Sequence, residues 1–423
     1  MRVREGDHRK MVSPAFWKIA GAGAAFQAGS SAVDSATVVA SLVHQLTGNV
    51  FAVGAASAVL RLGWLLPQIV VGFLAQRTSR RMPYYVFGAF GRAFCLALIA
   101  VLLWFAADLP TQATAAGFLV LWTLYAFVSG IVAVPYNDIV ARSIPSRARS
   151  RMLAWRFFGG GLFALAVAAL IHRLLGTLPL FSAYALIFAL AAALMILSSL
   201  LFVSAGEPPL DTDRRRPAAE GSVRGFLIGG WDTLRKDVRF RLFLYSQWLG
   251  GATLMALPFY VVAASDIGVG EADVAILLGA QTAGSLMSNA IWGRIGDSYG
   301  KLRLLQAVGM VRLLPPIGVL LILDLGIQAD TAIVGFAGLF VLIGALINGM
   351  TIGYLGYLME ISPDDRRPAY SAYFNSLASP AALLPLAGAA LVQIITIDAV
   401  FITATLAAVA QLIALHRISK LEG

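Results

Sequence analysis

Residues 180–204 read LFSAYALIFALAAALMILSSLLFVS and contain no charged side chain. An α-helix rises about 1.5 Å per residue, so about 20 apolar residues cross the roughly 30 Å hydrocarbon core of a bilayer. Comparable apolar stretches recur along the chain from Phe16 to Leu415. The sequence therefore predicts an all-α polytopic membrane protein.

The composition is that of a membrane protein. Of 423 residues, 59% are hydrophobic and 13% are charged, and the mean hydropathy is +0.79; soluble domains carry about 25% charged residues. Strand-type alternation of apolar and polar residues is missing, which argues against a barrel. Cys95 is the only cysteine, so neither a disulfide nor a cysteine-based metal site can form within one chain.

Charged residues and Gly/Pro clusters divide the apolar sequence into twelve predicted transmembrane helices. The predicted spans are 16–46, 50–75, 83–106, 112–143, 153–175, 180–204, 241–264, 272–296, 302–324, 330–360, 369–395 and 397–415. The one long polar segment, 205–240, separates a predicted N-terminal six-helix bundle (1–204) from a C-terminal one (241–423). Within it, Val223–Phe240 mixes apolar residues with Arg and Lys, which predicts an amphipathic helix on the cytoplasmic leaflet; a tethering linker is the alternative.

The placement of charge predicts the topology. With both termini inside, the cations gather in the segments expected to be cytoplasmic, namely Arg77, Arg80 and Arg81, Arg142 through Arg156, Arg214 to Arg241, and Lys301 with Arg303. The expected outer loops carry Arg173 as their one clear cation and hold acids instead: Asp108, Asp266, Glu271, Asp273, Asp324, Asp330 and Asp398. This positive-inside pattern explains the net charge of +10 without nucleic acid. It predicts a multi-pass protein of the bacterial inner membrane with both termini cytoplasmic.

An internal repeat supports the two halves. Four pairs of identical residues recur at nearly one spacing, 218 to 221, each at the equivalent place in its half: Gln27 and Gln247, Gly72 and Gly293, Arg92 and Arg312, and Pro145 and Pro363. A duplicated six-helix unit is the parallel repeat found in some transporter architectures.

Two equivalent loops carry a Gly-rich, basic motif. The first reads Gly72-Phe-Leu-Ala-Gln-Arg-Thr-Ser-Arg-Arg81, and the second reads Gly293-Arg-Ile-Gly-Asp-Ser-Tyr-Gly-Lys-Leu-Arg303. Glycine allows helices to approach closely, and an acid at a helix end can pair with basic groups in one conformation and release them in another. The alternative is a tight, positively charged turn that only sets the topology.

These loops resemble the signature loop of the major facilitator superfamily, which joins spans 2–3 and 8–9. The C-terminal copy is the better match, because Gln76 replaces the acid and Ser79 the second glycine of the N-terminal copy. The resemblance implies alternating access, with spans 1, 4, 7 and 10 lining a central cavity, and it implies that the loop residues take part in conformational gating: Gly72, Arg77, Gly293, Asp297, Gly300 and Lys301.

Asp34 lies in the first predicted span, and Arg61 lies near the middle of the second. Ionisable residues inside a membrane are costly, so each is a candidate functional residue. We expect Asp34 to be the proton-coupling acid; a structural ion pair with Arg61 is the alternative. Arg61 either holds an anionic substrate or keeps Asp34 charged. The repeat counterpart of Asp34 is Leu254, so any coupling is asymmetric between the halves.

Arg92 and Arg312 are repeat-related and lie on spans that are peripheral in the resembled family. We expect them to form structural ion pairs, Arg92 with Asp138 and Arg312 with Glu360, since the partners lie at similar depth. Uncharged polar residues complete the predicted substrate cavity around Arg61: Gln27, Tyr136, Asn137, Gln247, Asn289, Asn348 and Tyr354. Such side chains bind ligands or hydrogen-bond between helices.

Motifs of other protein classes are missing. Neither a phosphate-binding Gly-x-x-x-x-Gly-Lys-Ser/Thr loop nor a His-Glu-x-x-His zinc motif occurs, and the soluble segments are too short for a catalytic domain. We therefore expect no enzyme activity, no cofactor and no metal site. The expected partners are a small-molecule substrate, a proton or Na⁺, and membrane lipids, with the chain acting as a monomer.

The sequence thus predicts a secondary active transporter that moves a small organic solute by alternating access, coupled to protons. A gradient-independent facilitator or lipid flippase is one alternative. A membrane scaffold or sensor that has a transporter fold and carries no flux is another.

Overall fold

The computed structural model describes residues 14–76, 78, 80–209, 231, 234–251, 255–362, 373–375 and 377–422. In this part of the chain, ten helical stretches are long and apolar enough to cross a membrane. The first and seventh predicted spans each consist of two shorter helices instead. The predicted all-helical membrane fold is confirmed.

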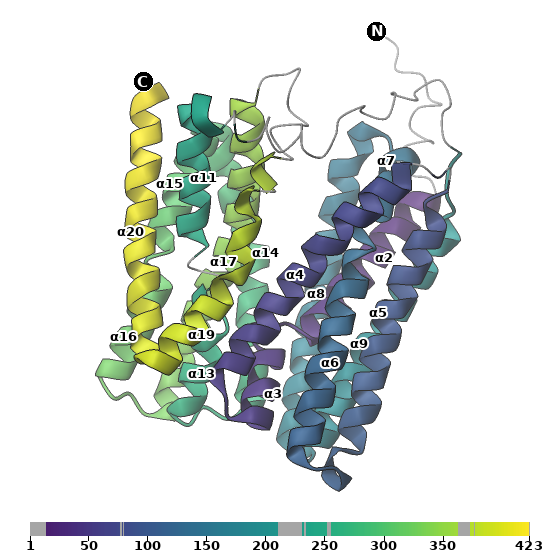
Figure 1. Cartoon of the computed structure of the whole chain (residues 1–423), viewed down its shortest axis with the longest axis vertical. Helices are drawn as coiled ribbons and strands as arrows, with labels where there is room; N and C mark the ends of the chain where they lie inside the picture. Colours follow the sequence, from purple (N-terminus) through teal and green to yellow (C-terminus); the bar gives the residue numbers. More distant parts are fainter. Residues whose placement is uncertain are drawn as a thin grey trace. The chain divides into compact units, whose positions relative to one another are not determined.

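The described residues fall into two compact units (Figure 1). The first draws on residues 1–48, 59–218 and 274–279, and the second on 49–58, 219–273 and 280–423. The helices up to the long polar segment are α2 (Pro14–Ala32), α3 (Val38–Thr47), α4 (Val50–Gln76), α5 (Met82–Trp104), η1 (Ala106–Asp108), α6 (Thr111–Gly130), α7 (Ala133–Ser143), α8 (Ser146–Thr177) and α9 (Leu180–Ala205). Those after it are α11 (Val238–Gly250), α13 (Phe259–Asp266), η3 (Glu271–Asp273), α14 (Val274–Ser298), α15 (Lys301–Val311), α16 (Leu314–Asp324), α17 (Ala329–Ile361), η4 (Ser379–Leu383), α19 (Leu384–Ile394) and α20 (Ile397–Glu422).

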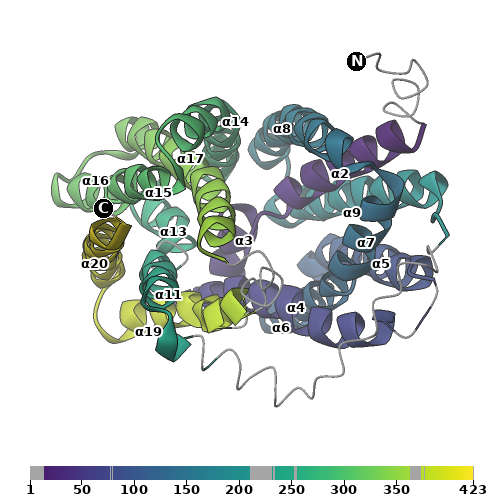
Figure 2. The same cartoon turned by 90° about the horizontal axis from the view of Figure 1, so that it is seen from above.

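In the first unit, α2 packs against both α8 and α9, and α5 packs against α9 and α6 (Figure 2). The inner face of α2 is rich in alanine and glycine, and small residues let helices approach closely in lipid. Near the start of α5, the Tyr85 ring lies 4.2 Å from the Phe202 ring of α9. Cys95, one turn beyond Arg92 on α5, is buried in the same helix bundle.

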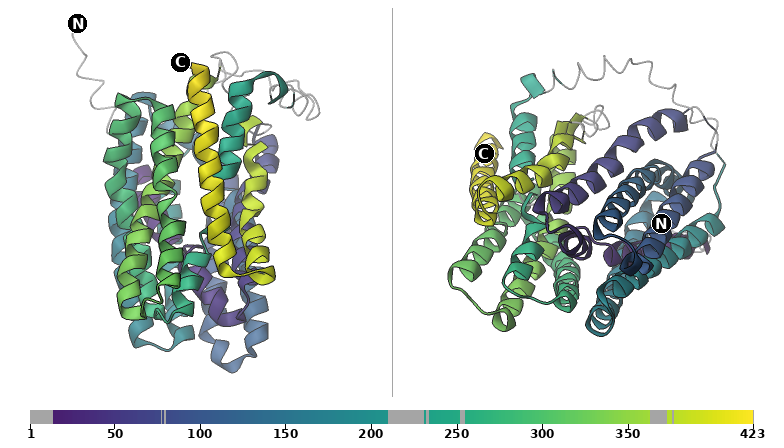
Figure 3. Two further views of the ribbon diagram at one scale, coloured as in Figure 1. Left: turned by 90° about the vertical axis from the view of Figure 1, so that its left-hand side faces the viewer. Right: turned by 60° about the horizontal axis from the view of Figure 1, so that its bottom comes forward.

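In the second unit, α20 runs beside α11 and also packs on α15, while α17 packs on α15 and α16 (Figures 1 and 3). Aromatic rings fill the space where α11 meets α17 and residues 373–375. Phe243 stacks on Phe374 with ring centroids 4.7 Å apart and meets Tyr357 edge to face at 5.0 Å.

Proline follows the helix break in the fourth and in the ninth predicted span. A proline lacks the N–H that would bond the carbonyl four residues earlier, and its ring crowds that carbonyl. Pro135 follows the break between α6 and α7, and Pro315 follows the break between α15 and α16. The first span breaks at Val33–Thr37, which contains no proline, and Asp34 lies in this break.

Large apolar side chains cover much of the outer surface. Phe87, Phe94 and Leu406 are each more than three-fifths exposed. Contiguous exposed apolar surface of this kind would promote association in water, whereas hydrocarbon solvates it.

The predicted amphipathic helix over Val223–Phe240 lies mostly outside the described residues. Its end differs from the prediction. The Asp237 carboxylate accepts a hydrogen bond from the Phe240 backbone N–H at 3.0 Å, which caps the start of α11. A new helix therefore begins at Val238, and the predicted helix does not run unbroken to Phe240.

Helices α14 and α17 cross closely at two glycines. A methyl group added to Gly284 would lie 2.8 Å from Val341 Cα, and one added to Gly344 would lie 2.9 Å from the Ser285 backbone nitrogen. Next to this crossing, Asn348 donates hydrogen bonds to the Ser285 carbonyl and hydroxyl oxygens, at 2.8 and 2.7 Å. The crossing therefore combines close backbone packing with an interhelical polar contact.

We predict that Gly344→Ala destabilises the protein by about 1–3 kcal/mol, because the added methyl group overpacks backbone atoms that cannot rotate away. Gly338→Ala on the same helix is the matched control, since a methyl group there meets no atom within 4 Å in the described structure. Thermal unfolding of the two purified variants in detergent gives the comparison. Equal melting temperatures would contradict the close crossing.

Candidate functional site

The first unit contains a cavity between its helices. Its volume is about 150 Å³, measured as the space open to the centre of a water-sized sphere. Its lining comes from α2 (Ala22, Gly23, Phe26), α4 (Trp64), α5 (Tyr85, Arg92), the α6–α7 region (Val132, Ala133, Tyr136, Asn137), α8 (Arg156) and α9 (Ser198). Arg92 lies ten residues into α5, near the middle of that 23-residue span, whereas Arg156 lies at the start of the membrane-spanning part of α8, Trp155–Thr177.

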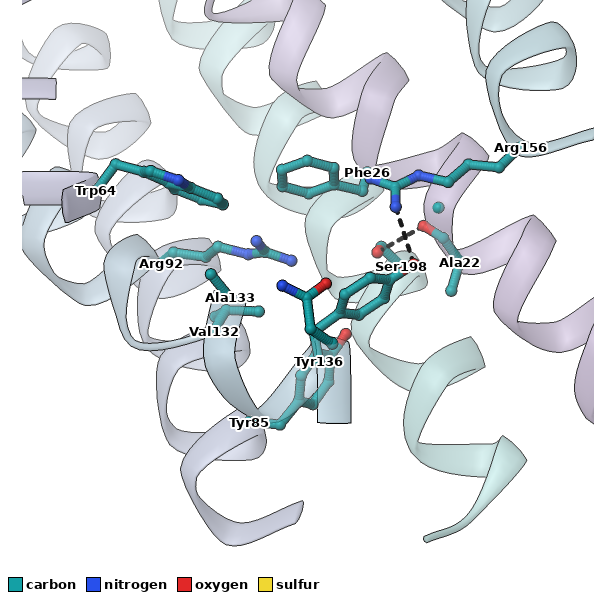
Figure 4. A pocket seen from close by; sticks show the side chains of 12 residues that line it. Ala22, Phe26, Trp64, Tyr85, Arg92, Val132, Ala133, Tyr136, Arg156 and Ser198 are labelled. Atoms are coloured by element: carbon teal, nitrogen blue, oxygen red, sulfur yellow. Dashed lines mark hydrogen bonds between the residues drawn. The ribbon is translucent and has the colours of Figure 1, made fainter. Parts of the chain in front are cut away.

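Arg92 is buried, with 2% of its surface exposed, and its guanidinium points into the cavity (Figure 4). Its guanidinium carbon lies 4.5 Å from the centre of the Phe26 ring. In the described part of the chain it has no hydrogen-bond or ion-pair partner, and its Nε is buried without one. A cation over an aromatic face is stabilised, by about 2 kcal/mol where both are desolvated. That contact only partly offsets the cost of burying the charge.

Arg156 approaches the cavity from the opposite side (Figure 4). One of its Nη atoms donates to the Tyr136 hydroxyl at 2.9 Å, and its guanidinium carbon lies 5.4 Å from the Tyr136 ring and 5.9 Å from the Phe26 ring. Its Nε is also buried without a partner. The side chain passes over Gly23, where a methyl group would lie 2.6 Å from Arg156 Nε.

The electrostatics of the cavity follow from these two side chains. Both arginines face the same space, and the described residues that line it include neither Asp nor Glu. Phe26 lies within cation–π distance of both guanidinium groups, and aromatic faces carry partial negative charge. The cavity is therefore electropositive, with aromatic walls.

Asp34 lies at the break between α2 and α3. One carboxylate oxygen, Oδ1, accepts hydrogen bonds from the backbone N–H groups of Ala36 and Thr37, both at 3.0 Å, and from the Thr37 hydroxyl at 2.9 Å. The Asp34 carbonyl also accepts from the Val39 N–H at 3.0 Å. The carboxylate thus satisfies donors that the interrupted helix leaves open, as a helix cap does.

Arg61 lies near enough to Asp34 for the two charges to interact, although the described structure has no direct ion pair between them. On α4, Arg61 lies one turn before Trp64, which lines the cavity. Residues three apart share a helix face. The Asp34–Arg61 region is therefore connected to the cavity through α4.

The predicted cavity residues divide between the two units. Tyr136 and Asn137 line the cavity. Gln27 lies beside Gly160 and has a buried Oε1 without a partner, and neither it nor Arg61 is among the described lining residues. In the second unit, Asn348 donates a hydrogen bond to the Ser285 carbonyl. Asn289 is exposed, and the buried Oε1 of Gln247 has no partner among the described residues. The fourth predicted residue of this unit is Tyr354.

Tyr354 belongs to a buried polar network in the second unit, in which Arg312 Nε and Nη2 have no partner among the described residues. The Gln411 amide donates to the Tyr354 hydroxyl at 2.7 Å and to the Ser246 carbonyl at 2.9 Å, and it accepts from Arg312. The prediction that Arg312 pairs with Glu360 is wrong, because the Arg312 guanidinium donates to an amide oxygen on α20 instead.

The prediction that Arg92 pairs with Asp138 is also wrong. Asp138 pairs with Arg142, one turn along α7, at 2.8 Å, and with Arg81 Nε at 3.4 Å. Similar depth in the membrane does not bring two side chains together, since they also have to face one another around their helix axes. Arg92 faces the cavity, and Asp138 faces the end of the helix bundle.

Glu207, which sequence reasoning did not single out, completes this charged end. Its carboxylate accepts from Arg142 Nη2 at 2.7 Å and from the backbone N–H groups of Arg81 and Met82 at 2.7 and 2.9 Å. Two orphan donors at the start of α5 are satisfied in this way, by a group that the positive end of the helix dipole also favours. The signal available in the sequence was an acid followed by two prolines, directly after an apolar span.

These contacts change the acidity of Glu207. Burial alone raises its pKa, but the hydrogen bond from Arg142 and those from the two backbone N–H groups outweigh that effect and hold the pKa below its ordinary value near 4.5. Glu207 therefore stays ionised near neutral pH. Its side chain is 12% exposed and joins the end of α9 to the start of α5 and to the end of α7.

The C-terminal signature loop is more exposed than the Glu207 cluster. Asp297 pairs with Lys301 at 3.2 Å, but the Asp297 side chain is 82% exposed, and such ion pairs contribute little. Gly300 has a φ of +87°, which explains the glycine, whereas Gly293 has no atom within 4 Å of an added methyl group and so provides no close helix contact. In the N-terminal copy, Arg77 and the surroundings of Gly72 lie outside the described residues.

Comparisons with known proteins agree with this architecture. The family model that matches is that of the Major Facilitator Superfamily, over residues 19–384, so the chain belongs to this superfamily. No curated protein matches its sequence.

Among the described residues, no three His, Cys, Asp or Glu side chains gather as a metal site would require.

Several solved transporter structures share the fold. A bacterial homologue of the iron transporter ferroportin, in an inward-facing state, is 11% identical with a TM-score of 0.71, covering 96% of this chain and 98% of that one. The nucleoside transporter NupG is 13% identical with a TM-score of 0.65, covering 96% and 98%. A POT family transporter in complex with 5-aminolevulinic acid is 13% identical with a TM-score of 0.67, covering 96% of both chains. The family and the fold are thus those of membrane transporters.

We predict that Glu207→Gln lowers stability at pH 7 by about 1–3 kcal/mol, because an amide makes weaker hydrogen bonds to Arg142 and to the start of α5. A lowered pKa contributes stability above the ordinary pKa and loses it as the pH falls through the folded value. The difference in melting temperature between the parent and Glu207→Gln should therefore be constant from neutral pH down to about 5.5 and shrink below 4.5.

Asp297→Asn is the matched control for this experiment, since its carboxylate also pairs with a basic residue but is mostly exposed. It should change the melting temperature little at any pH. A difference for Glu207→Gln that is independent of pH would contradict the assigned role of the Glu207 charge.

Proposed function

We propose that this protein is a secondary active transporter that moves a small organic solute across the membrane by alternating access, coupled to protons. The observation that carries the proposal is the break in the first span, where Asp34 holds the start of α3 with its carboxylate. Membership of the superfamily and a cavity between the helices of the first unit support transport.

Asp34 links protonation to helix geometry in this proposal. Three donors converge on the ionised Oδ1, from Ala36 N–H, Thr37 N–H and the Thr37 hydroxyl. A proton on the carboxyl group weakens it as an acceptor and so loosens the turn at Ala36 and Thr37, directly before α3. Discontinuous helices near the substrate site are common moving parts of transporters. Proton binding would therefore favour a different packing of α3 against α6.

The nearby Arg61 charge sets the balance of this equilibrium. It interacts electrostatically with Asp34 without pairing directly. Because no ion pair among the described residues fixes the carboxylate to Arg61, the acid stays free to take up a proton when its surroundings change. Arg61 is in this way a regulator of the acid rather than its fixed partner.

Charged contacts at the helix ends would serve as gates. The cluster of Arg81, Asp138, Arg142 and Glu207 joins α5, α7 and α9 within the first unit, and Asp297 with Lys301 stands at the equivalent loop of the second. Since Gln76 replaces the acid of the N-terminal signature loop, we assign the stronger latch of the first unit to Glu207. Such pairs re-form or separate when helices shift.

We further propose that the protein acts as a monomer in the bacterial inner membrane with both termini cytoplasmic. The distribution of lysine and arginine between the loops supports this orientation. Membrane lipids would cover the exposed apolar faces, and the transported solute and the proton would be the functional partners.

We predict that Asp34→Asn abolishes gradient-driven transport while leaving exchange of solute down its own gradient. The Asn side chain keeps an oxygen that can accept from Ala36 and Thr37, so the fold is retained, but it cannot bind a proton in this pH range. Proteoliposomes loaded with a pH-sensitive dye and exposed to a pool of small metabolites report solute-dependent proton flux directly.

Asp108→Asn is the control, because Asp108 is an exposed acid in the short helix η1. It should leave proton flux unchanged. Solute-dependent proton flux that survives in Asp34→Asn would remove Asp34 from the mechanism. Solute movement without any proton flux in the parent protein would favour a facilitator.

A further inference from the structure

We infer that the cavity of the first unit binds an organic anion, with Arg92 and Arg156 holding its acidic group and the aromatic walls holding its body. This inference rests on the proposed transport function and names its substrate class. The two arginines face one cavity from α5 and α8, and neither has an acidic partner in the described part of the chain (Figure 4).

The first step of the argument is the unbalanced charge. A buried ionised side chain within a transmembrane span, such as that of Arg92, is costly unless it is paired, and here the like charge of Arg156 faces the same cavity. The Nε atoms of Arg92 and Arg156 are both buried and without a partner. A guanidinium group offers a planar fork of donors that fits a carboxylate or a phosphate. The missing partner is therefore an oxyanion supplied from solution.

The second step is the shape of the remaining wall. Phe26 lies against both guanidinium groups, and Trp64, Ala22 and Val132 add apolar surface, so most of the cavity is suited to a carbon skeleton. Tyr136 orients Arg156 by accepting its hydrogen bond, and Asn137 supplies a further polar group. An inorganic ion would leave this apolar surface exposed to water. A small carboxylic acid or phosphate monoester with an apolar or aromatic body matches the whole site.

The third step compares the two repeats. The spacings that relate Arg92 to Arg312 and Pro145 to Pro363 also relate Gly23 to Phe243, Tyr136 to Tyr354 and Arg156 to Phe374. In the second unit Phe243 and Phe374 stack on one another at 4.7 Å, and Arg312 is engaged by Gln411.

In the first unit the corresponding pair is Gly23 and Arg156. The glycine leaves the space in which the Arg156 side chain lies, since a methyl group would stand 2.5 Å from its Cγ. One copy of the repeat is thus filled by hydrophobic packing, and the other places a second cation beside an open cavity. Packing alone does not require the arginine, because its counterpart position is occupied by a phenylalanine. This asymmetry assigns Arg156 to ligand binding.

The test measures the melting temperature of the purified full-length protein in detergent at pH 7, at constant ionic strength set with KCl. The probes are two pairs of an aromatic anion and a neutral analogue, benzoate against benzamide and phenyl phosphate against phenol, together with inorganic phosphate alone. We expect benzoate or phenyl phosphate to raise the melting temperature above the KCl value, because a ligand that binds the folded state stabilises it, and we expect the neutral analogues to have no such effect. The stronger of the two anions identifies the acidic group as carboxylate or phosphate.

Arg92→Gln and Arg156→Gln should each weaken apparent binding of that anion by about tenfold to a hundredfold, which corresponds to the loss of charged hydrogen bonds. Gly23→Ala should weaken it as well, since the methyl group displaces Arg156 without removing a charge. Gly21→Ala is the matched control, because a methyl group there makes only an ordinary contact, 3.7 Å from Leu201 Cδ1. It should bind as the parent does.

The inference would be overturned if neither organic anion stabilises the parent beyond KCl, or if the anions stabilise the double variant Arg92→Gln/Arg156→Gln as much as the parent. Stabilisation by inorganic phosphate equal to that by both organic anions would also overturn it, since the aromatic walls would then contribute nothing. The assay uses no gradient, so its outcome is independent of coupling. Anion binding without proton flux would support this inference and contradict proton coupling. Proton flux driven by neutral solutes alone would support proton coupling and contradict anion binding.

Discussion

Hydrocarbon offers no hydrogen bonds, so each interruption of a helix inside the membrane has to be satisfied by the protein itself. Much of this structure follows from that constraint. The break in the first span is held by the Asp34 carboxylate, which collects the donors of Ala36 and Thr37. The start of α5 is held in the same manner by Glu207. In both places a carboxylate stands at the N-terminal end of a helix, where unpaired N–H groups and the helix dipole favour negative charge. One of these groups is set in a transmembrane span, and the other at the end of the bundle.

The two halves of the chain use one frame in different ways. In the second unit the repeat-related positions are filled by stacked rings and a hydrogen-bonded network of Arg312, Gln411 and Tyr354. In the first unit the equivalent region stays open and holds two cations that the described residues do not neutralise. The duplicated halves share a scaffold, but they differ at a few equivalent positions. At one of them the first unit has Gly23, which leaves space for Arg156, and the second has Phe243, which stacks on Phe374.

Much of the fold was predictable because apolar stretches of membrane length are a strong signal, and the superfamily match confirms the class. The candidate site was less accessible to sequence reasoning. Tyr136 and Asn137 lie in the cavity as expected, because polar residues within spans are costly and therefore informative. Arg156 was hidden in a run of cations that the topology already explained. Arg92 was assigned a partner by depth, although the direction of a side chain around its helix decides what it meets. Glu207 lay in the polar segment, where an acid ordinarily contacts water.

The single thiol of the chain has a practical consequence. Cys95 is fully enclosed on α5, one turn from Arg92. A dye that fluoresces only after reacting with a thiol will therefore stay dark until that helix separates from its neighbours. The signal reports local opening of the first bundle alone, because the second bundle contains no cysteine. The natural sequence thus contains a site-specific reporter placed next to the arginine cavity, so occupancy of that cavity can be followed through protection of Cys95 without labelling the molecule elsewhere.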